Sequence, residues 1–387
     1  MTAGRLVFWA LWALLMAGWA PAARADAIAA AREALADTVS IGEVDVTLWP
    51  PRVDTYGQVW IPKGLYGEAK GWGLGLETVL PFTVLGPDTT RTSEIGLDVM
   101  GTTKGQWRFQ VDSELYWNHD RRYARFRLDY DDLAREFYGV GPATGKAARE
   151  FYRPGAIVAY IEAAWGVGGG SFTIGPRLEL HRQRLTDTPA GGQLDTGAVP
   201  GAEDETNAGA GVVATWDRRD DRYIPTAGSY VQVLAMRFDD ALIGSHHFGL
   251  LSADARAYRR VARRQVLAAQ AFFYGVRGDV PFWRLASLGG RHHTRAYPRD
   301  RWLDQTLLAA QAEWRWRFHD HVGINVFGGG AVVGPRIGDL QWKYVRPTVG
   351  AGLRLFAERG PTAVPIRVDM AVGVGHWRAS MGIGEAF

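Results

Sequence analysis

The sequence contains no cysteine, so a disulfide framework, a cysteine-based zinc or iron–sulfur site and a thiol nucleophile are all excluded. It also lacks a strong excess of one charge, because 44 Lys and Arg residues oppose 41 Asp and Glu residues, which leaves a balance of +3. That balance gives no reason to expect a nucleic-acid partner or a polybasic membrane contact. With 47% hydrophobic residues, the chain is too apolar to be intrinsically disordered.

Long hydrophobic runs are absent except at the start of the chain, where residues 6–20 are apolar. This run follows Arg5 and precedes a small-residue cleavage pattern that ends just before Asp26. These are the three parts of a secretory signal peptide, and the run is short for a transmembrane helix, which needs about 20 apolar residues. We therefore predict that residues 1–25 are a cleaved signal peptide; the alternative is an uncleaved N-terminal anchor.

Beyond this segment, apolar and polar residues alternate with the period of two that a β-strand produces. In one such segment, Trp314 and Trp316 share an apolar face, whereas Glu313 and Arg315 lie on the opposite, polar face. That segment is 307–318, and the same alternation occurs in 107–118, 172–181 and 366–374. Densely charged polar faces and aromatic residues at strand ends are typical of an outer-membrane barrel with a wet lumen. Because a sheet in a membrane must close, we predict an all-β fold, a transmembrane antiparallel β-barrel.

The alternating segments define about sixteen strands, an even number, as bacterial barrels require. The predicted strands are 54–66, 71–83, 89–101, 105–117, 121–132, 154–166, 169–184, 207–217, 228–242, 247–262, 263–276, 305–318, 321–334, 344–356, 364–375 and 378–387. The long connections 133–153, 185–206 and 277–304 all fall on one side of this arrangement, and the connections on the other side are mostly short. Short periplasmic turns and long outer loops are the rule for such barrels.

Residues 26–53 precede the first predicted strand and are too few to form a hydrophobic core of their own. The sequence therefore predicts three parts: the signal peptide 1–25, a short periplasmic segment 26–53, and an outer-membrane β-barrel over 54–387. Such a chain is exported to the outer membrane of a Gram-negative type of cell, where lipid surrounds it.

Four stretches of the sequence resemble the bacterial surface antigen barrels, the superfamily of the assembly proteins BamA and TamA and of the two-partner secretion transporters. They are Phe137–Gly141; Asp217-Arg218-Arg219-Asp220 with Pro225 and Gly228; Leu288-Gly289-Gly290 followed by Thr294–Asp300 and Glu313-Trp314-Arg315; and Ile366–Asp369 with Gly384–Phe387. In this order and spacing they cover most of residues 54–387.

The third stretch resembles the family's Arg-Gly-aromatic tripeptide on the sixth outer loop, which in the family folds back into the lumen. The resemblance assigns this motif to Arg295, Ala296 and Tyr297, with Ala296 in place of the usual glycine, and it assigns Glu313 as the acidic partner in the lumen. Glycines follow Phe327 where the family often has an aspartate, so we expect Glu313 to hold Arg295 alone. The alternative is that Arg295 is an ordinary solvated loop residue.

Two further motifs come with the resemblance. A periplasmic turn motif comprises Asp217, Arg219, Asp220, Pro225 and Gly228, the last two opening the next strand. Phe387 provides the aromatic end that outer-membrane barrels tend to have and that the assembly machinery reads, so we expect it to be a C-terminal assembly signal. The alternative is that the chain merely ends in Phe.

The resemblance implies a non-catalytic barrel that assists protein assembly or translocation at the outer membrane, or that acts as a scaffold for a partner protein. The expected partners are outer-membrane lipid, the barrel assembly machinery during insertion, and a client or partner protein that the sequence does not identify. The chain departs from the family because it has no room for polypeptide-transport-associated domains before the barrel. The alternative is a passive pore for small solutes, and the discriminating feature is whether the sixth loop fills the lumen.

A barrel enzyme is a third class, and it would need a convergent Ser or His site. The sequence has no G-x-S-x-G, H-E-x-x-H or G-x-x-x-x-G-K-[ST] motif. The pairs His246-His247 and His292-His293 fall in predicted outer loops, where we expect solvated side chains rather than metal ligands. We therefore expect no catalysis, no metal and no cofactor.

Overall fold

The protein is described from a computed structural model, which places residues 44–47, 52–53, 59–82, 91–168, 171–356 and 365–387. The chain divides into two units, 1–42 and 43–387, and all described residues belong to the second. The predicted signal peptide and most of the predicted periplasmic segment therefore lie outside the described residues. Among the described residues, no helix is long and apolar enough to cross a membrane.

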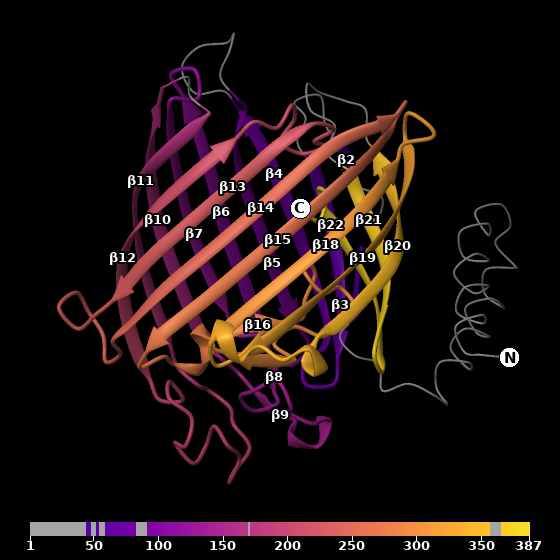
Figure 1. The fold of residues 1–387 in the computed structure, drawn as a ribbon. Helices are drawn as coiled ribbons and strands as arrows, with labels where there is room; N and C mark the ends of the chain where they lie inside the picture. Colours follow the sequence, from indigo (N-terminus) through magenta and orange to yellow (C-terminus); the bar gives the residue numbers. More distant parts are fainter. Residues whose placement is uncertain (1–43, 48–51, 54–58, 83–90, 169–170, 357–364) are drawn as a thin grey trace, which may run out of the picture. The chain divides into compact units, whose positions relative to one another are not determined.

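One large antiparallel sheet of tilted strands dominates the fold (Figure 1). Of its 18 strands, the short β1 (Val44–Thr47) and β2 (Arg52–Val53) leave 18 − 2 = 16 long strands. These are β3 Val59–Gly67, β4 Gly71–Phe82, β5 Ser93–Thr102, β6 Trp107–Trp117, β7 Arg122–Asp131, β10 Ala156–Val167, β11 Phe172–Gln183, β12 Glu205–Asp217, β13 Gly228–Phe238, β14 Phe248–Ala262, β15 Gln265–Gly278, β18 Thr306–Trp316, β19 Val322–Gly334, β20 Arg346–Phe356, β21 Pro365–Gly373 and β22 His376–Ile383. Each matches one predicted strand, so the predicted all-β fold with about sixteen strands is confirmed.

The ladder runs in chain order from β3 to β22, each long strand pairing with the next one. Both β1 and β2 pair with the other edge of β3. The Cα atoms of β1 and β22 approach within 8 Å, but among the described residues no ladder joins β22 to β3. The expected closure between the first and last long strands is therefore not observed, because β1 and β2 occupy the edge of β3 that would form it.

The two faces of the sheet differ as the alternation predicts. On β18 and β19 the apolar side chains of Leu308 and Val326 point outward and are 43% and 47% exposed, as a lipid-facing surface requires. Glu313 and Arg315, whose parity is opposite to that of Leu308, are buried on the inner face. Successive side chains of a strand point to opposite faces, so the polar half of every strand lines the lumen.

The connections between strands alternate in length. The connections β7–β10, β11–β12 and β15–β18 are long and emerge at one end of the sheet, called here the loop end, where Figure 1 shows β8 (Arg135–Phe137), β9 (Glu150–Tyr152) and β16 (Ala286–Leu288). The opposite end is called the turn end. The β15–β18 connection also contains β17 (Trp302–Asp304), which pairs with β16. The last strand ends at Ile383, four residues before the predicted limit, because Gly384 turns the chain with φ +76°.

Candidate functional site

The β15–β18 connection, residues 279–305, forms the sixth loop, and its middle part lies inside the lumen. The β16–β17 pair brings the two arms of the loop together. Gly289 then lets the chain reverse: its φ is +124°, and a Cβ there would lie 1.8 Å from the carbonyl oxygen of Pro298. A tight turn follows, in which the N–H of Tyr297 donates to the carbonyl of Thr294 over 3.1 Å. Contacts within the loop therefore hold residues 294–297 as a compact tip.

The tip of the sixth loop is buried. Arg295, Ala296 and Tyr297 are 1%, 0% and 0% exposed. Ala296 does not have a positive φ, so the backbone does not require the glycine that the family usually has at this position. The substitution of alanine for glycine is thus compatible with the inserted loop.

The guanidinium of Arg295 is surrounded by partners from the strands that follow. Its Nη2 lies 2.5 Å from the Glu313 carboxylate and donates to Gln311 Oε1 over 3.2 Å. Its Nη1 donates to Asp369 over 2.9 Å, and its plane lies over the Phe327 ring, 3.8 Å from the centroid. Glu313 therefore does not hold Arg295 alone, since Asp369 on β21 supplies the second acid that β19 lacks.

Two further arginines complete this buried cluster. Arg354 of β20 donates to Asp369 over 2.7 Å and to Glu313 over 3.1 Å. Arg315 of β18 donates to Glu313 over 3.2 Å. Each carboxylate thus receives bonds from two or more guanidinium groups, which is how a buried charge avoids the penalty of being left without a partner. Four strands, β18 to β21, are tied to the loop through this cluster.

Tyr297 anchors the tip on the loop-end side of the cluster. Its hydroxyl donates to the carbonyl of Pro347 over 2.7 Å and accepts from the N–H of Val374 over 3.0 Å. Its ring packs edge-on against Trp302 at 5.2 Å between centroids. Gly373 makes room for this ring, because a Cβ at residue 373 would lie 2.5 Å from the Tyr297 ring. The aromatic residue of the motif is therefore held by both polar and apolar contacts.

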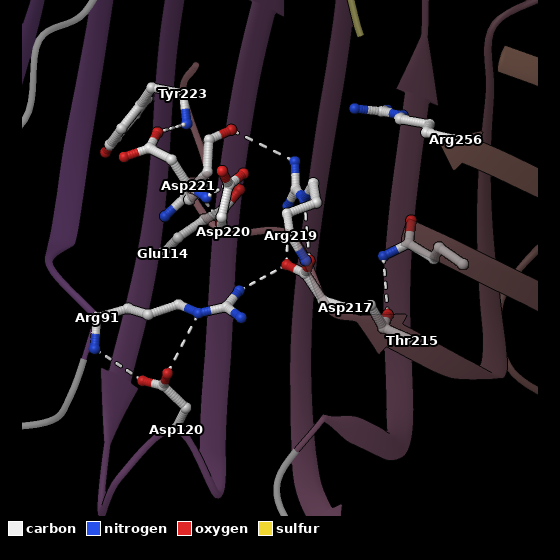
Figure 2. Close-up of polar contacts among 12 residues, drawn as sticks. Arg91, Glu114, Asp120, Thr215, Asp217, Arg219, Asp220, Asp221, Tyr223 and Arg256 are labelled. Atoms are coloured by element: carbon white, nitrogen blue, oxygen red, sulfur yellow. Dashed lines mark hydrogen bonds and ion pairs between the residues drawn. The ribbon is translucent and has the colours of Figure 1, made fainter. Parts of the chain in front are cut away.

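The turn motif lies between β12 and β13, in residues 218–227, called here the β12–β13 turn (Figure 2). Asp217, the last residue of β12, accepts bonds from Arg219 Nε over 2.9 Å and Nη2 over 2.8 Å. Asp220 accepts from the N–H groups of Asp221, Thr226 and Ala227 over 3.0, 2.8 and 3.0 Å. Asp217 and Asp220 thus stabilise the turn by accepting hydrogen bonds from other residues of the turn.

Ionised Asp220 is the form that this turn requires. Partial burial alone would raise the pKa of Asp220, but hydrogen bonds from the Thr226 hydroxyl and from three backbone N–H groups hold that pKa below its ordinary value. Pro225 is buried in the turn. Gly228 follows with φ +101°, and a Cβ there would lie 2.0 Å from the carbonyl oxygen of Arg218, so only glycine fits.

Phe387 lies in the lumen rather than on the outer face of β22. It is 4% exposed and packs with Tyr258, Val266 and Ala268 of β14 and β15. Its main-chain oxygen accepts from Arg315 Nη2 over 3.0 Å. Glu385, two residues earlier, accepts from Arg354 Nε over 2.8 Å. The segment 384–387 therefore joins the same charged cluster that holds the sixth loop.

The histidine pairs of the loops behave differently from one another. The rings of His292 and His293 are 6.5 Å apart between centroids, and His293 stacks on Phe272. His247 lies with Asp239 and Asp240 in a group whose ligand atoms could hold a metal ion. That group is mostly exposed, and exposed acidic groups near a histidine are common without any ion.

Sequence reasoning singled out Arg295, Tyr297, Glu313 and the turn motif, and the structure brings Arg295 and Glu313 together. It did not identify the residues that meet them across the lumen. Parity places Asp369 and Arg354 on the polar faces of their strands, but it does not show that they meet Arg295 and Glu313. Arg222 and Glu94, which pair over 2.8 Å, are too far apart in the sequence for any local pattern to connect them.

Comparisons with known proteins agree with this architecture. The Omp85 superfamily domain matches residues 97–387. A crystal structure of BamA from Haemophilus ducreyi lacking POTRA domains 1–3 is similar with a TM-score of 0.54 at 14% identity, over 93% of this chain and 79% of that one. CdiB from Acinetobacter baumannii (TM-score 0.53, 11% identity) and CdiB from Escherichia coli (0.54, 12%) each match over 84% of this chain. This chain covers 58% and 61% of those two structures. A comparison with curated proteins gave no significant match.

Proposed function

The chain belongs to the Omp85 superfamily, and we propose that it assists the assembly or translocation of other proteins at the outer membrane, without catalysis of its own. Barrels of this superfamily are outer-membrane proteins that act as transporters or assembly factors. The finer proposal includes export by cleavage of residues 1–25, a short periplasmic segment over 26–53, and contact with the barrel assembly machinery during insertion.

The observation that carries this proposal is the burial of the sixth loop. The Arg295 and Glu313 side chains are both 0% exposed, so the loop tip excludes water from the centre of the charged cluster. A solute pore needs a continuous aqueous path, whereas here a loop, a turn and the segment 384–387 all enter the lumen. These contacts support a role in handling polypeptides over a passive pore for small solutes.

The test compares the two functions in one preparation. Purified full-length protein, reconstituted in liposomes, is given a denatured outer-membrane barrel protein, and the appearance of its heat-modifiable folded band is followed. The same liposomes are placed in an isotonic sugar solution, and their swelling is recorded. We expect faster folding of the added protein than in empty liposomes, and no swelling.

The opposite pair of results, swelling without any acceleration of folding, would show that the chain is a pore. The Arg299→Ala variant checks that both measurements tolerate a change on the exposed surface of the sixth loop. Arg299 is 62% exposed and contacts its neighbour Asp300 over 3.5 Å. This variant is expected to behave as the wild type in both measurements.

A further inference from the structure

The β12–β13 turn reaches across the lumen to strands that are not its neighbours. Arg222, in the middle of the turn, donates from Nη2 to Glu94 over 2.8 Å and to Glu114 over 2.5 Å. Glu94 and Glu114 are paired residues of β5 and β6, and the strands β7, β10 and β11 separate β6 from β12 in the ladder. The hydroxyl of Tyr223 also donates to Glu94. The turn therefore crosses the lumen and contacts β5 and β6, instead of contacting only the strands beside it.

Ion pairs of Arg91 form a second connection between the same two parts of the barrel wall. Arg91, just before β5, lies with Nη1 2.5 Å from Asp217 and with Nε 3.2 Å from Asp120, which belongs to the β6–β7 turn (Figure 2). Its backbone N–H donates to Asp120 over 2.7 Å. The start of β5, the β6–β7 turn and the end of β12 are thus joined through one guanidinium.

The β12–β13 turn is held together by hydrogen bonds among its own residues. Besides the bonds to Asp220, the carboxylate of Asp221 accepts from the N–H groups of Tyr223 and Ile224 over 2.7 and 2.8 Å. Arg219 donates to the carbonyl of Arg222 over 3.3 Å, which links the start of the turn to its middle. These bonds lie within the turn and would survive if its contacts with β5 and β6 were broken.

The contacts between the turn and the far wall differ in kind from those of the sixth loop. Arg222, Glu94 and Glu114 are 16%, 18% and 15% exposed, whereas the Arg295 and Glu313 side chains are fully buried. Water and salt can reach the partly exposed pairs of Arg222, but they cannot reach the fully buried pair of Arg295 and Glu313. The turn is therefore held by contacts that open more easily than those of the sixth loop.

We propose that the β12–β13 turn is a latch over the turn end of the lumen, held shut by Arg222 on Glu94 and Glu114 and by Arg91 on Asp217. When water replaces these ion pairs, the turn swings away as a unit and exposes the lumen face of β12 and β13. The latch operates at the end opposite to the loop end, from which the sixth loop enters. It does not rest on the role in protein assembly, because it concerns access to the lumen and requires no client.

The chain contains no cysteine, so one introduced thiol reports on access without interference. Thr215 suits this purpose, since it lies two residues before Asp217 on the same face of β12 and donates no bond to the turn (Figure 2). The Thr215→Cys protein in lipid nanodiscs is treated with a bulky, membrane-impermeant maleimide, and the labelling rate is measured. Adding Arg222→Ala, which removes the ion pairs with Glu94 and Glu114, is expected to raise that rate by about tenfold.

The matched control is Arg218→Ala in the same reporter protein. Arg218 belongs to the same turn, but it is exposed and stacks over Trp216 at 4.7 Å, so it does not contact β5 or β6 through that guanidinium. Arg218→Ala is expected to leave the labelling rate unchanged. Equal rates in the two variants would overturn the proposal.

A second pair of changes keeps the test decisive if Arg222→Ala does not fold. Glu94→Gln combined with Glu114→Gln weakens the same bridge from the opposite wall, without altering the turn. We expect this variant also to label faster, and 1 M salt, with a Debye length of about 3 Å, to accelerate labelling of the unaltered turn. Heat-modified gel mobility confirms folding of each variant. A folded double variant that labels at the reporter's original rate would exclude the latch.

Discussion

At the scale of single residues, Arg295 is the side chain whose replacement should cost most. Arg295→Ala leaves the Glu313 and Asp369 carboxylates short of a partner in a buried site, and removing one partner of such a pair typically costs about 3–5 kcal/mol. Arg295→Lys should cost nearly as much, because a single ammonium cannot contact Glu313, Asp369 and Gln311 together or lie flat over Phe327. The measurement is urea unfolding followed by heat-modified gel mobility.

A double-mutant cycle separates the pair from its surroundings. The coupling energy between Arg295→Ala and Glu313→Gln should be large and favourable, since the two groups are 2.5 Å apart in a dry site. Arg299→Ala, the exposed neighbour in the same loop, provides the reference value. A coupling energy near zero would show that the loop is not held by this pair.

Gly373→Ala tests the other anchor of the loop tip. The added methyl group would lie 2.5 Å from the Tyr297 ring, and overpacking of this kind typically costs about 1–3 kcal/mol. We expect a lower midpoint of unfolding and faster proteolysis of the sixth loop. Gly328→Ala is the matched control, because its Cβ would meet only the Thr348 carbonyl oxygen, at an ordinary 3.9 Å. Equal effects of the two substitutions would contradict the role of Tyr297.

The sequence could predict Arg295 and Glu313 because each has a local signal, a loop motif in one case and the parity of β18 in the other. It could not predict Asp369 as a partner of Arg295. The parity of β21 places Asp369 on the inner face, but which inner-face residues meet depends on strand tilt and on how deeply the loop enters. These are properties of the assembled sheet and leave no trace in a single strand.

At the scale of elements, the β12–β13 turn depends on one glycine. Gly228→Ala is expected to destabilise the protein by about 1–3 kcal/mol, because the residue has φ +101° and its Cβ would lie 2.0 Å from the Arg218 carbonyl oxygen. Gly249→Ala on the adjacent β14 is the control, since its Cβ would meet one oxygen at 3.8 Å. The midpoint of thermal unfolding checks both. A Gly228→Ala protein as stable as the Gly249→Ala protein would show that the turn adapts.

The last segment of the chain supports a separate prediction. If Phe387 is the predicted C-terminal assembly signal, Phe387→Asp should slow barrel assembly. It should also destabilise the folded barrel by placing a charge beside Val266 and Ala268. Tyr258→Ala distinguishes the two effects, since it removes a packing partner of Phe387 and leaves the aromatic end intact. We expect Tyr258→Ala to lower stability without slowing assembly, measured as the rate at which the heat-modifiable band appears.

The strands themselves show how far periodicity reaches. All sixteen long strands lie where alternation predicted them, because a strand with one face in lipid and one face in water must alternate. The ends of strands were less predictable. The strand β22 ends at Ile383 because Gly384 turns the chain inward, and the alternating pattern does not show this turn. Likewise, β1 and β2 were not expected, because they are too short to show a period.

At the scale of the whole molecule, the sixth loop and the β12–β13 turn fill different parts of the lumen, and the segment 384–387 joins the charged cluster of the loop. The sixth loop is bonded to β18, β20 and β21, the β12–β13 turn is bonded to β5 and β6, and Phe387 packs on β14 and β15. The loop and the turn share no hydrogen-bonded partner among the described contacts of Arg295 and Arg222. Because distant sites without common partners act independently, the sixth loop should open without opening the β12–β13 turn, and the turn without opening the loop.

This independence gives a prediction for ion conductance in planar bilayers. Arg295→Ala loosens the sixth loop but leaves the latch, and Arg222→Ala loosens the latch but leaves the loop, so each single variant should conduct little more than the wild type. The double variant Arg295→Ala/Arg222→Ala should conduct far more than the sum of the two single increments, since two obstructions in series limit flow until both are removed. The control is Arg299→Ala/Arg218→Ala, which alters one exposed arginine in each insert. If Arg295→Ala alone reaches the conductance of the double variant, the sixth loop is the sole obstruction and the turn end of the lumen is open in the wild type.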